Sequence, residues 1–316
     1  MPRIDSYGGK ASAPRSLRWS LLAALALMLG LASTVWAQNE PAVNRKPVDD
    51  AAFAQIADQF QYDHNLPLES VTIGAWPYRI PYVIEKIAYR SVHHERVPGY
   101  FAHPVAEEGR RFPAVLLVHG SNGFWGKNED WVLDWLDVLV RSGRAVLVID
   151  NYGFGERMQS PDIEEERLLP YAMRDMVVQS VIDQRRGIDY LETRPDVDPK
   201  KLGLLGGSRG SWIGAMVAGL DHRFSAVVLT VTQESNGSTD DPSRRYRHTL
   251  NFVPRIAAPV LLVNATQDKP VRSQLANEMT SLLRVPHRQV WYESGHYIAP
   301  KTGNKEVLEW FDTYLK

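Results

Sequence analysis

The stretch LGLLGGSRGSW (residues 202–212) places two glycines, a serine, an arginine and a third glycine directly after an apolar run. Its centre, Gly206 to Gly210, matches the pattern G-x-S-x-G, in which a serine occupies a sharp turn between a buried strand and a helix. The residues two before and two after the serine must lack bulk, because strand and helix pack closely there. We therefore predict that Ser208 stands exposed as a nucleophile. An ordinary strand-to-helix turn with an inert serine is the alternative.

Beyond residue 110 the chain alternates apolar runs with helical patterns. Continuous Val-, Leu- and Ile-rich runs indicate strands buried on both faces of a parallel sheet, and they occupy residues 114–120, 145–150, 201–207, 225–231, 259–265 and 288–293. Apolar residues at three- and four-residue spacing indicate helices between them, within 132–140, 173–191 and 275–283. This alternation predicts an α/β fold with a mostly parallel, doubly wound sheet.

The first 82 residues divide into two segments that precede this pattern. In residues 1–37, Arg15 and Arg18 stand before an apolar run of 11 residues, and small residues lead to Ala37, which is typical of a cleavable signal peptide. The run is shorter than the ~18 residues that a membrane-spanning helix needs. We therefore expect a periplasmic or secreted protein that keeps no stable membrane span after cleavage.

Residues 38–82 are expected to form an N-terminal arm that contains a short helix within residues 49–62. The α/β domain is then expected to occupy residues 83–316. It begins with two alternating stretches, 83–91 and 96–105, which predict an antiparallel hairpin at the leading edge of the sheet.

Composition excludes several classes of site. The chain has 36 Lys and Arg residues against 37 Asp and Glu residues, and it has no cysteine. A disulfide framework, a thiolate metal site and a cysteine nucleophile are therefore excluded, and the near-neutral charge gives no support for binding nucleic acid. The sequence contains no nucleotide-binding glycine motif and no H-E-x-x-H pattern. We expect no cofactor and no metal.

A serine nucleophile requires a base, and the base requires an acid that orients it. In chains with this turn the order is serine, acid, histidine. The run 259–265 leads into Asp268, and the run 288–293 leads into His296. Because the carboxyl ends of parallel strands meet at one edge of a sheet, we predict that both side chains lie near Ser208.

Each of these two partners has a simpler interpretation that the sequence leaves open. Asp268 stands two residues before Pro270 and a helical pattern, so it could serve only as a helix N-cap. His296 could be an ordinary histidine on a surface loop. Glu234, in the loop after the run 225–231, is the reserve candidate for the acid.

The developing oxyanion requires two backbone N–H groups. We predict that they belong to Arg209, which follows the nucleophile, and to Ser121, which follows the strand that ends at His119. Aromatic side chains on or beside the same loops are candidates for lining a substrate pocket, namely Phe124, Trp125, Trp212 and Tyr297.

Five stretches together resemble the dienelactone-hydrolase-like branch of the α/β-hydrolase superfamily: LLVHGSNG (116–123), VLVIDNYGFGER (146–157), RRGIDYLETRPDVDPKKLGLLGGSRG (185–210), APVLLVNATQDKPV (258–271) and ESGHYI (293–298). The resemblance covers roughly residues 83–316. It implies the eight-stranded α/β-hydrolase sheet, hydrolysis of an ester-type bond without a cofactor, and catalysis by Ser208, Asp268 and His296. The enzymes that give the family its name use a cysteine nucleophile, which this chain lacks, so a serine esterase is the better interpretation.

The sequence thus predicts an exported serine hydrolase that acts on a small-molecule ester through an acyl-enzyme intermediate. Two alternatives remain at this stage. One is a serine peptidase or amidase on the same fold, and the other is a non-catalytic binding protein that keeps the fold. A large separation between the His296 ring and Ser208 would favour the binding protein.

Overall fold

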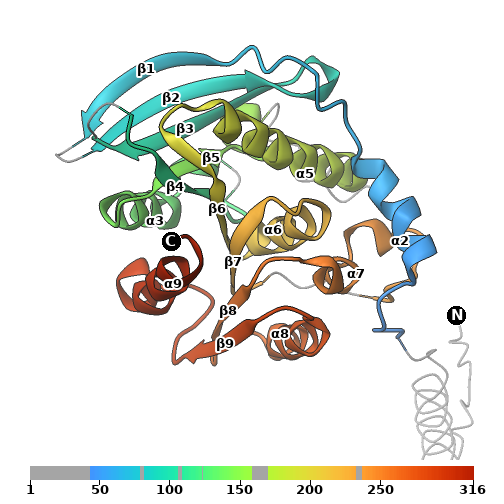
Figure 1. Cartoon of the computed structure of the whole chain (residues 1–316). Coiled ribbons are helices and arrows are strands. Elements are labelled where there is room, and N and C mark those ends of the chain that lie inside the picture. Colours follow the sequence, from blue (N-terminus) through green and yellow to red (C-terminus); the bar gives the residue numbers. More distant parts are fainter. Residues whose placement is uncertain (1–42, 79–81, 106–108, 123, 159–169, 233–236) are drawn as a thin grey trace, which may run out of the picture. The chain divides into compact units, whose positions relative to one another are not determined.

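The predicted parallel sheet is present and has nine strands in the order β1-β2-β3-β5-β4-β6-β7-β8-β9 (Figure 1). The computed structural model describes residues 43–78, 82–105, 109–122, 124–158, 170–232 and 237–316. The predicted signal peptide and Glu234 lie outside the described residues. The strands are β1 (Val71–Tyr78), β2 (Tyr82–Arg90), β3 (Arg96–Pro104), β4 (Phe112–Val118), β5 (Ala145–Ile149), β6 (Val197–Gly207), β7 (Phe224–Thr230), β8 (Val260–Ala265) and β9 (His287–Tyr292).

The strand directions confirm the predicted fold class. From β5 through β4, β6, β7 and β8 to β9 every neighbouring pair is parallel. Strands β2 and β3 form the predicted antiparallel hairpin, and β3 joins the parallel part by pairing antiparallel with β5. The carboxyl ends of β4, β6, β7, β8 and β9 therefore open onto one edge, where ligands bind in α/β sheets.

The sheet has one strand more than the eight that were expected. Strand β1 comes from the segment interpreted as part of the arm, and it pairs antiparallel with β2. Two features explain why the sequence pattern did not predict β1. Gly74 and Pro77 interrupt it, and its apolar side chains are exposed, with Ile73 59% and Trp76 52% accessible. An exposed edge strand does not show the continuous burial that marks the central strands.

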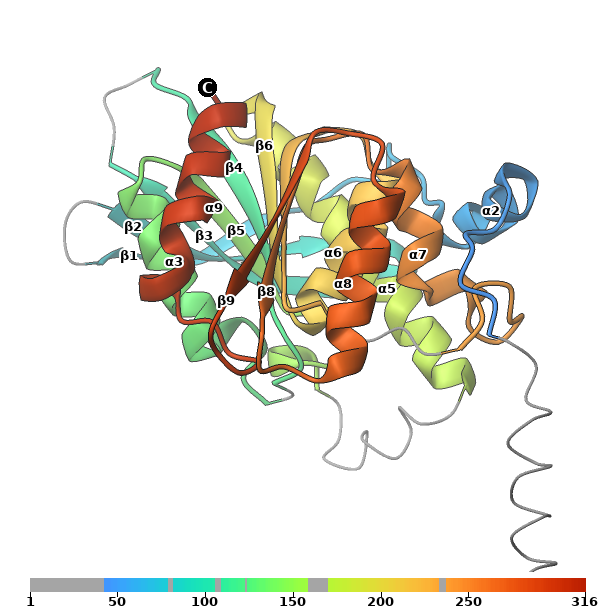
Figure 2. The same ribbon diagram turned by 90° about the horizontal axis from the view of Figure 1, so that it is seen from below.

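Helices cover both faces of the sheet, as Figures 1 and 2 show. They are α2 (Asp50–Ala57), α3 (Asp130–Arg141), α5 (Pro170–Thr193), α6 (Arg209–Leu220), α7 (Thr249–Phe252), α8 (Pro270–Leu282) and α9 (Pro300–Tyr314). Helices α3 and α9 pack on one face, and α5 to α8 pack on the other. Neighbouring strand residues serve opposite faces: Leu204 packs under α6, while Leu205 joins the cluster of α3 and α9. Successive side chains of a strand point to opposite faces of the sheet, and both faces are covered by helices. The strands are therefore unbroken apolar runs in the sequence.

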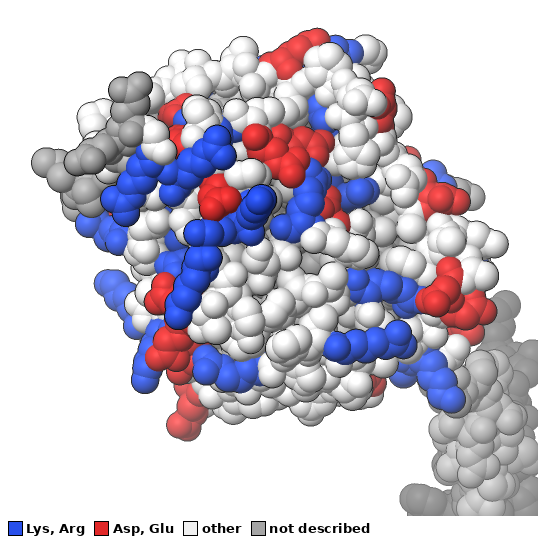
Figure 3. Space-filling model, viewed as in Figure 1, with Lys and Arg blue, Asp and Glu red and all other residues white. Residues whose placement is uncertain are grey.

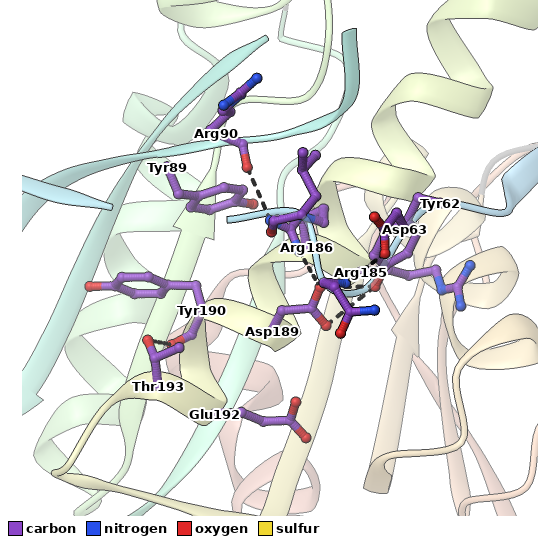
Figure 4. A network of polar contacts seen from close by, with 12 residues as sticks. Tyr62, Asp63, Tyr89, Arg90, Arg185, Arg186, Asp189, Tyr190, Glu192 and Thr193 are labelled. Atoms are coloured by element: carbon purple, nitrogen blue, oxygen red, sulfur yellow. Dashed lines mark hydrogen bonds and ion pairs between the residues drawn. The ribbon is translucent and has the colours of Figure 1, made fainter. Parts of the chain in front are cut away.

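Buried arginines of α5 hold the chain that follows α2 (Figure 4). The Nη1 group of Arg185 donates to the carbonyl oxygen of Phe60 at 2.8 Å, and the Nη2 group of Arg186 donates to that of Leu66 at 2.6 Å. Arg186 also pairs with Asp189 at 2.8 Å, and its side chain is 1% exposed. These hydrogen bonds satisfy backbone carbonyl groups in a segment that does not pair with a strand.

The start of the arm is attached to the opposite end of the helical layer. Arg45 pairs with Glu278 of α8 at 2.5 Å. The backbone N–H of Val48 donates to the Oδ1 atom of Asn251 at 3.0 Å, and Arg255 returns a bond of 3.0 Å to the carbonyl oxygen of Val48. The arm therefore contacts α5, α7 and α8 in addition to the sheet.

Charged side chains of both signs share the surface. The face drawn in Figure 3 carries Lys and Arg side chains with Asp and Glu side chains between them. Ion pairs at the surface include Arg141 with Asp137 at 2.9 Å and Arg90 with Glu69 at 2.6 Å. The absence of a nucleic-acid partner stays a prediction. In the described part of the chain, none of the helices combines the length and apolar character needed to cross a membrane.

We expect Arg186→Met to lower the free energy of unfolding by about 2–3 kcal/mol, because the carbonyl of Leu66 and the carboxylate of Asp189 each lose a buried partner. Denaturant titration monitored by circular dichroism measures this change. The matched control is Arg174→Met on the same helix, where the side chain is exposed and pairs with Asp175 at the surface; we expect a change within about 0.5 kcal/mol. Equal losses in the two variants would contradict the buried role of Arg186.

Candidate active site

The turn between β6 and α6 places Ser208 in a strained backbone conformation. Its dihedral angles are φ 54° and ψ −116°, a region that non-glycine residues seldom occupy. A Cβ atom on Gly206 would lie 2.4 Å from the carbonyl oxygen of Gly210, and one on Gly210 would lie 2.0 Å from that of Val118. The two glycines of the pattern are therefore sterically required, and the serine stands at the amino end of α6, where negative charge is favoured.

The structure brings the three predicted side chains into one hydrogen-bonded chain. The hydroxyl of Ser208 lies 2.8 Å from the Nε2 atom of His296, and the Nδ1 atom of His296 lies 2.7 Å from Asp268 Oδ2. Asp268 follows β8 and His296 follows β9, so both come from the strand ends that the sequence indicated. With Nδ1–H donating to the carboxylate, Nε2 is free to accept the serine proton.

Asp268 serves its loop as well as the histidine. Its Oδ1 atom accepts the backbone N–H of Lys269 at 2.8 Å, and its side chain is only 7% exposed. Burial raises the pKa of Asp268, but the hydrogen bonds from His296 and Lys269 outweigh burial, and the net pKa is lowered. The acid therefore stays ionised beside the imidazole. Asp268 is therefore not simply the N-cap of a helix, since no side-chain hydrogen bond caps α8.

Arg272 of α8 lies against the imidazole of His296, and sequence reasoning missed it. Its Nη1 atom is 2.8 Å from His296 Nε2, also contacts His296 Nδ1, and is 3.5 Å from Asp268 Oδ2. A usable signal was present in the sequence. Arg272 follows Asp268 by four residues at the start of a helical pattern, which is the spacing that brings side chains together.

Ser208 opens into a pocket of about 460 Å³. Trp131, Val231 and Tyr297 form its apolar and aromatic walls, and Glu129 and Arg272 supply charged ones. A pocket of this size accepts a small organic molecule. No cluster of three or more His, Cys, Asp or Glu side chains suited to a metal ion occurs among the described residues. That neither a metal nor a cofactor is needed stays a prediction.

The structure places the four aromatic side chains that were predicted to line the pocket in different environments. Tyr297 lines the pocket. The prediction for Trp212 is wrong: the side chain is 2% exposed, its Nε1 group donates to the carbonyl oxygen of Arg247, and the first turn of α6 directs it into the helical layer. Phe124 and Trp125 are 71% and 59% exposed and stand outside the pocket lining. A role for these two in binding stays a prediction.

The two loops predicted to stabilise the oxyanion meet beside the nucleophile. Ser121 lines the pocket, and a Cβ atom on Gly120 would lie only 3.8 Å from the Cβ atom of Ser208. Arg209 is the first residue of α6, and its side chain packs against the rings of Phe154 and Trp212. The assignment of the backbone N–H groups of Ser121 and Arg209 stays a prediction.

A buried ionic clamp holds the loop that carries Ser121. Asp150 accepts the backbone N–H of Lys127 at 2.8 Å and its ammonium group at 2.6 Å, with the Lys127 side chain fully buried. Nearby, His119 donates from Nδ1 to the carbonyl oxygen of Gly120 and accepts the N–H of Asn151 at Nε2. Burial lowers the pKa of His119 to about 4, so this ring is neutral and structural.

Glu129 is the second pocket residue that the sequence did not reveal. Its Oε2 atom is buried and has no hydrogen-bond partner among the residues that the structure describes. Burial raises the pKa of the carboxyl group, a bond from the Gly120 backbone lowers it, and the neighbouring carboxylate of Asp130 raises it again, for a net increase. Glu129 precedes α3 without capping it by a side-chain bond.

Residues 97–314 match the dienelactone hydrolase family. The Bacillus subtilis protein YtaP, named as a hydrolase, is 30% identical over 160 residues, which cover 48% of this chain and 53% of YtaP. YuxL of the same organism, named as an uncharacterized peptidase, is 22% identical over 268 residues, covering 73% of this chain and 39% of YuxL. An acetyl xylan esterase from Paenibacillus sp. R4 superimposes with a TM-score of 0.69 at 19% identity, covering 88% of this chain and 98% of the esterase.

The chain belongs to the dienelactone hydrolase family, and this membership confirms the expected resemblance. The chain spans about half the length of YtaP and less of YuxL. At 19% identity the likeness to the esterase structure shows the fold alone. It confirms the α/β-hydrolase architecture.

We expect Glu129→Gln to stabilise the protein near neutral pH. The folded state binds the Glu129 proton more tightly than the unfolded chain does, so ionisation costs stability once the pH rises above the unfolded pKa. A neutral amide avoids this cost, so the midpoint of thermal unfolding should rise, by about 2 °C for each kcal/mol gained in a chain of this size. Calorimetry near neutral pH measures it. The gain should shrink toward acid pH, where glutamate is protonated in both states; a gain independent of pH would contradict this origin.

Proposed function

We propose that this hydrolase cleaves carboxylic esters through a Ser-His-Asp triad and a covalent acyl-enzyme intermediate. The observation that carries the proposal is the pair of contacts of His296, 2.8 Å to the hydroxyl of Ser208 and 2.7 Å to the carboxylate of Asp268. This geometry of hydroxyl, imidazole and carboxylate supports their roles as nucleophile, base and orienting acid in acyl transfer. This close contact speaks against the non-catalytic binding protein.

In the proposed reaction, Ser208 Oγ attacks the carbonyl carbon of the ester while His296 Nε2 takes its proton. The buried carboxylate of Asp268 holds the imidazole and stabilises its positive charge. The backbone N–H groups of Ser121 and Arg209 donate to the oxyanion. The imidazolium then gives the proton to the departing alcohol, and water, activated by the same base, releases the acid and restores the serine.

An ester is favoured over other acyl substrates by two observations. The chain has no cysteine, so the thiolate chemistry of the enzymes that give the family its name is not available to it. Two solved structures with this fold, from Paenibacillus sp. R4 and from an Arctic intertidal metagenome, bear the names of esterases. Because YuxL is named as a peptidase, a serine peptidase remains the competing proposal.

We expect Ser208→Ala to abolish turnover of p-nitrophenyl acetate and labelling by a fluorophosphonate, with unchanged circular dichroism, because no other group can form the acyl-enzyme. Ser225→Ala is the control: its hydroxyl donates to the carbonyl oxygen of Lys200, far from the strand ends that form the site. Labelling retained in Ser208→Ala would exclude the proposed nucleophile. Faster turnover of a matched aryl amide than of the ester by the intact enzyme would favour the peptidase.

We also propose that the protein is exported and that residues 1–37 are removed. The basic residues Arg15 and Arg18, the apolar run and the small residues at Ala37 support this, and these residues lie outside the described part of the structure.

Expression of the full chain in a bacterial host should yield an envelope or culture-medium form whose amino terminus is Gln38, as read by mass spectrometry. The expected reason is cleavage after the small residues that end at Ala37. A cytoplasmic protein with an intact terminus would contradict export without bearing on the esterase proposal.

A further inference from the structure

One charged side chain of the catalytic pocket has no part in the proposed reaction. A Cβ atom placed on Gly120 would lie 3.5 Å from Glu129 Oε2, 3.6 Å from the carbonyl oxygen of Gly207 and 3.8 Å from Ser208 Cβ. The carboxylate therefore stands beside both the oxyanion loop and the nucleophile. The triad is complete without it, because Asp268 already bonds to His296.

Among the residues that the structure describes, the carboxylate of Glu129 is incompletely bonded. The Oε2 atom has no partner among the described residues, and the bond from Gly120 is the one hydrogen bond to this group that contributes to its pKa. A buried polar atom without a partner is destabilising. The terminal torsion of a glutamate is broad, so either oxygen can turn toward the pocket that the residue lines. A hydrogen-bond donor on a bound molecule would supply the missing bond.

The other pocket residues decide which kind of donor fits. Arg272 lines the same pocket, and its guanidinium repels an ammonium group. A hydroxyl group is neutral, and it can donate to the carboxylate and accept from the guanidinium. Trp131 and Tyr297 provide flat apolar surface for the carbon skeleton.

We propose that Glu129 is a specificity-determining residue that accepts a hydrogen bond from a hydroxyl group of the ester, so that the enzyme prefers esters of hydroxylated compounds. This inference rests on the proposed esterase function. It assigns the charged wall of the pocket to substrate recognition and leaves bond cleavage to Ser208, His296 and Asp268.

The test uses sets of esters that differ in one group. The first compares methyl butyrate with the analogues in which the terminal methyl of the acyl chain is replaced by a hydroxyl or by an ammonium group. The second compares propyl acetate with hydroxyethyl acetate, which carries the same change on the alcohol side. Values of kcat/KM are measured by pH-stat for the mature wild-type enzyme and for Glu129→Gln, which keeps the size of the side chain and an acceptor for Gly120. Asp134→Asn, which removes an exposed carboxylate from the next turn of α3, is the matched control.

We expect the wild-type enzyme to prefer the hydroxylated member of at least one set, and Glu129→Gln to reduce that preference about tenfold, the effect of losing one hydrogen bond to a charged group. Asp134→Asn should keep the preference. The inference is overturned by an unchanged preference in Glu129→Gln, by a wild-type enzyme that is indifferent to the hydroxyl, or by a preference for the ammonium ester. Failure of the wild-type enzyme to hydrolyse any ester would instead reject the proposed function.

Discussion

The active edge of this protein depends on the close approach of α6 to strand β4. At Gly210 the helix backbone comes so near to the carbonyl of Val118 that no side chain fits between them, and Gly206 meets the backbone of Gly210 in the same way. The chain can enter the helix only through a turn in which Ser208 adopts a positive φ. Such a conformation costs about 1–3 kcal/mol, which the surrounding structure must offset. The bond from the N–H of Ser208 to the carbonyl of Thr230 and the parallel neighbours of β6 supply part of that support.

Once the serine is fixed, the remaining groups arrive from successive strand ends. Asp268 and His296 follow β8 and β9, while the oxyanion loop follows β4 and is held through Lys127 to Asp150 at the end of β5. The proposed base and acid thus come from one side of Ser208, and the contacts that brace the loop after β4 come from the other. The pocket lies between them, with Arg272 contributed from the first side and Glu129 from the second.

Sequence reasoning succeeded where a signal is local or follows from the order of the strand ends, and it failed where the position of a side chain depends on tertiary packing. The strands that surround Ser208 are buried on both faces, so their apolar runs are unbroken, and the glycine pattern of the turn follows directly from sterics. Strand β1 escaped notice because its outer face is exposed and it contains Pro77. Trp212 was assigned to the pocket from its place beside the nucleophile, yet the direction of a side chain on a helix depends on which face the layer above covers. Glu129 is a charged residue at a helix start, and nothing in a linear pattern indicates that it lines the same cavity as Arg272.

The contacts of the arm set a lower limit on the piece of this chain that can stand alone. A fragment that begins at residue 83, where the α/β pattern starts in the sequence, would lack β1. Strand β2 would then lose its antiparallel hydrogen-bonded neighbour. It would also leave Arg185 without the carbonyl of Phe60 and Arg186 without that of Leu66 inside the helical layer. The removal of residues 44–48 would further free Glu278 on the helix that carries Arg272. The autonomous unit therefore begins near Asn44, and the arm belongs to the enzyme body instead of serving as a tether to it.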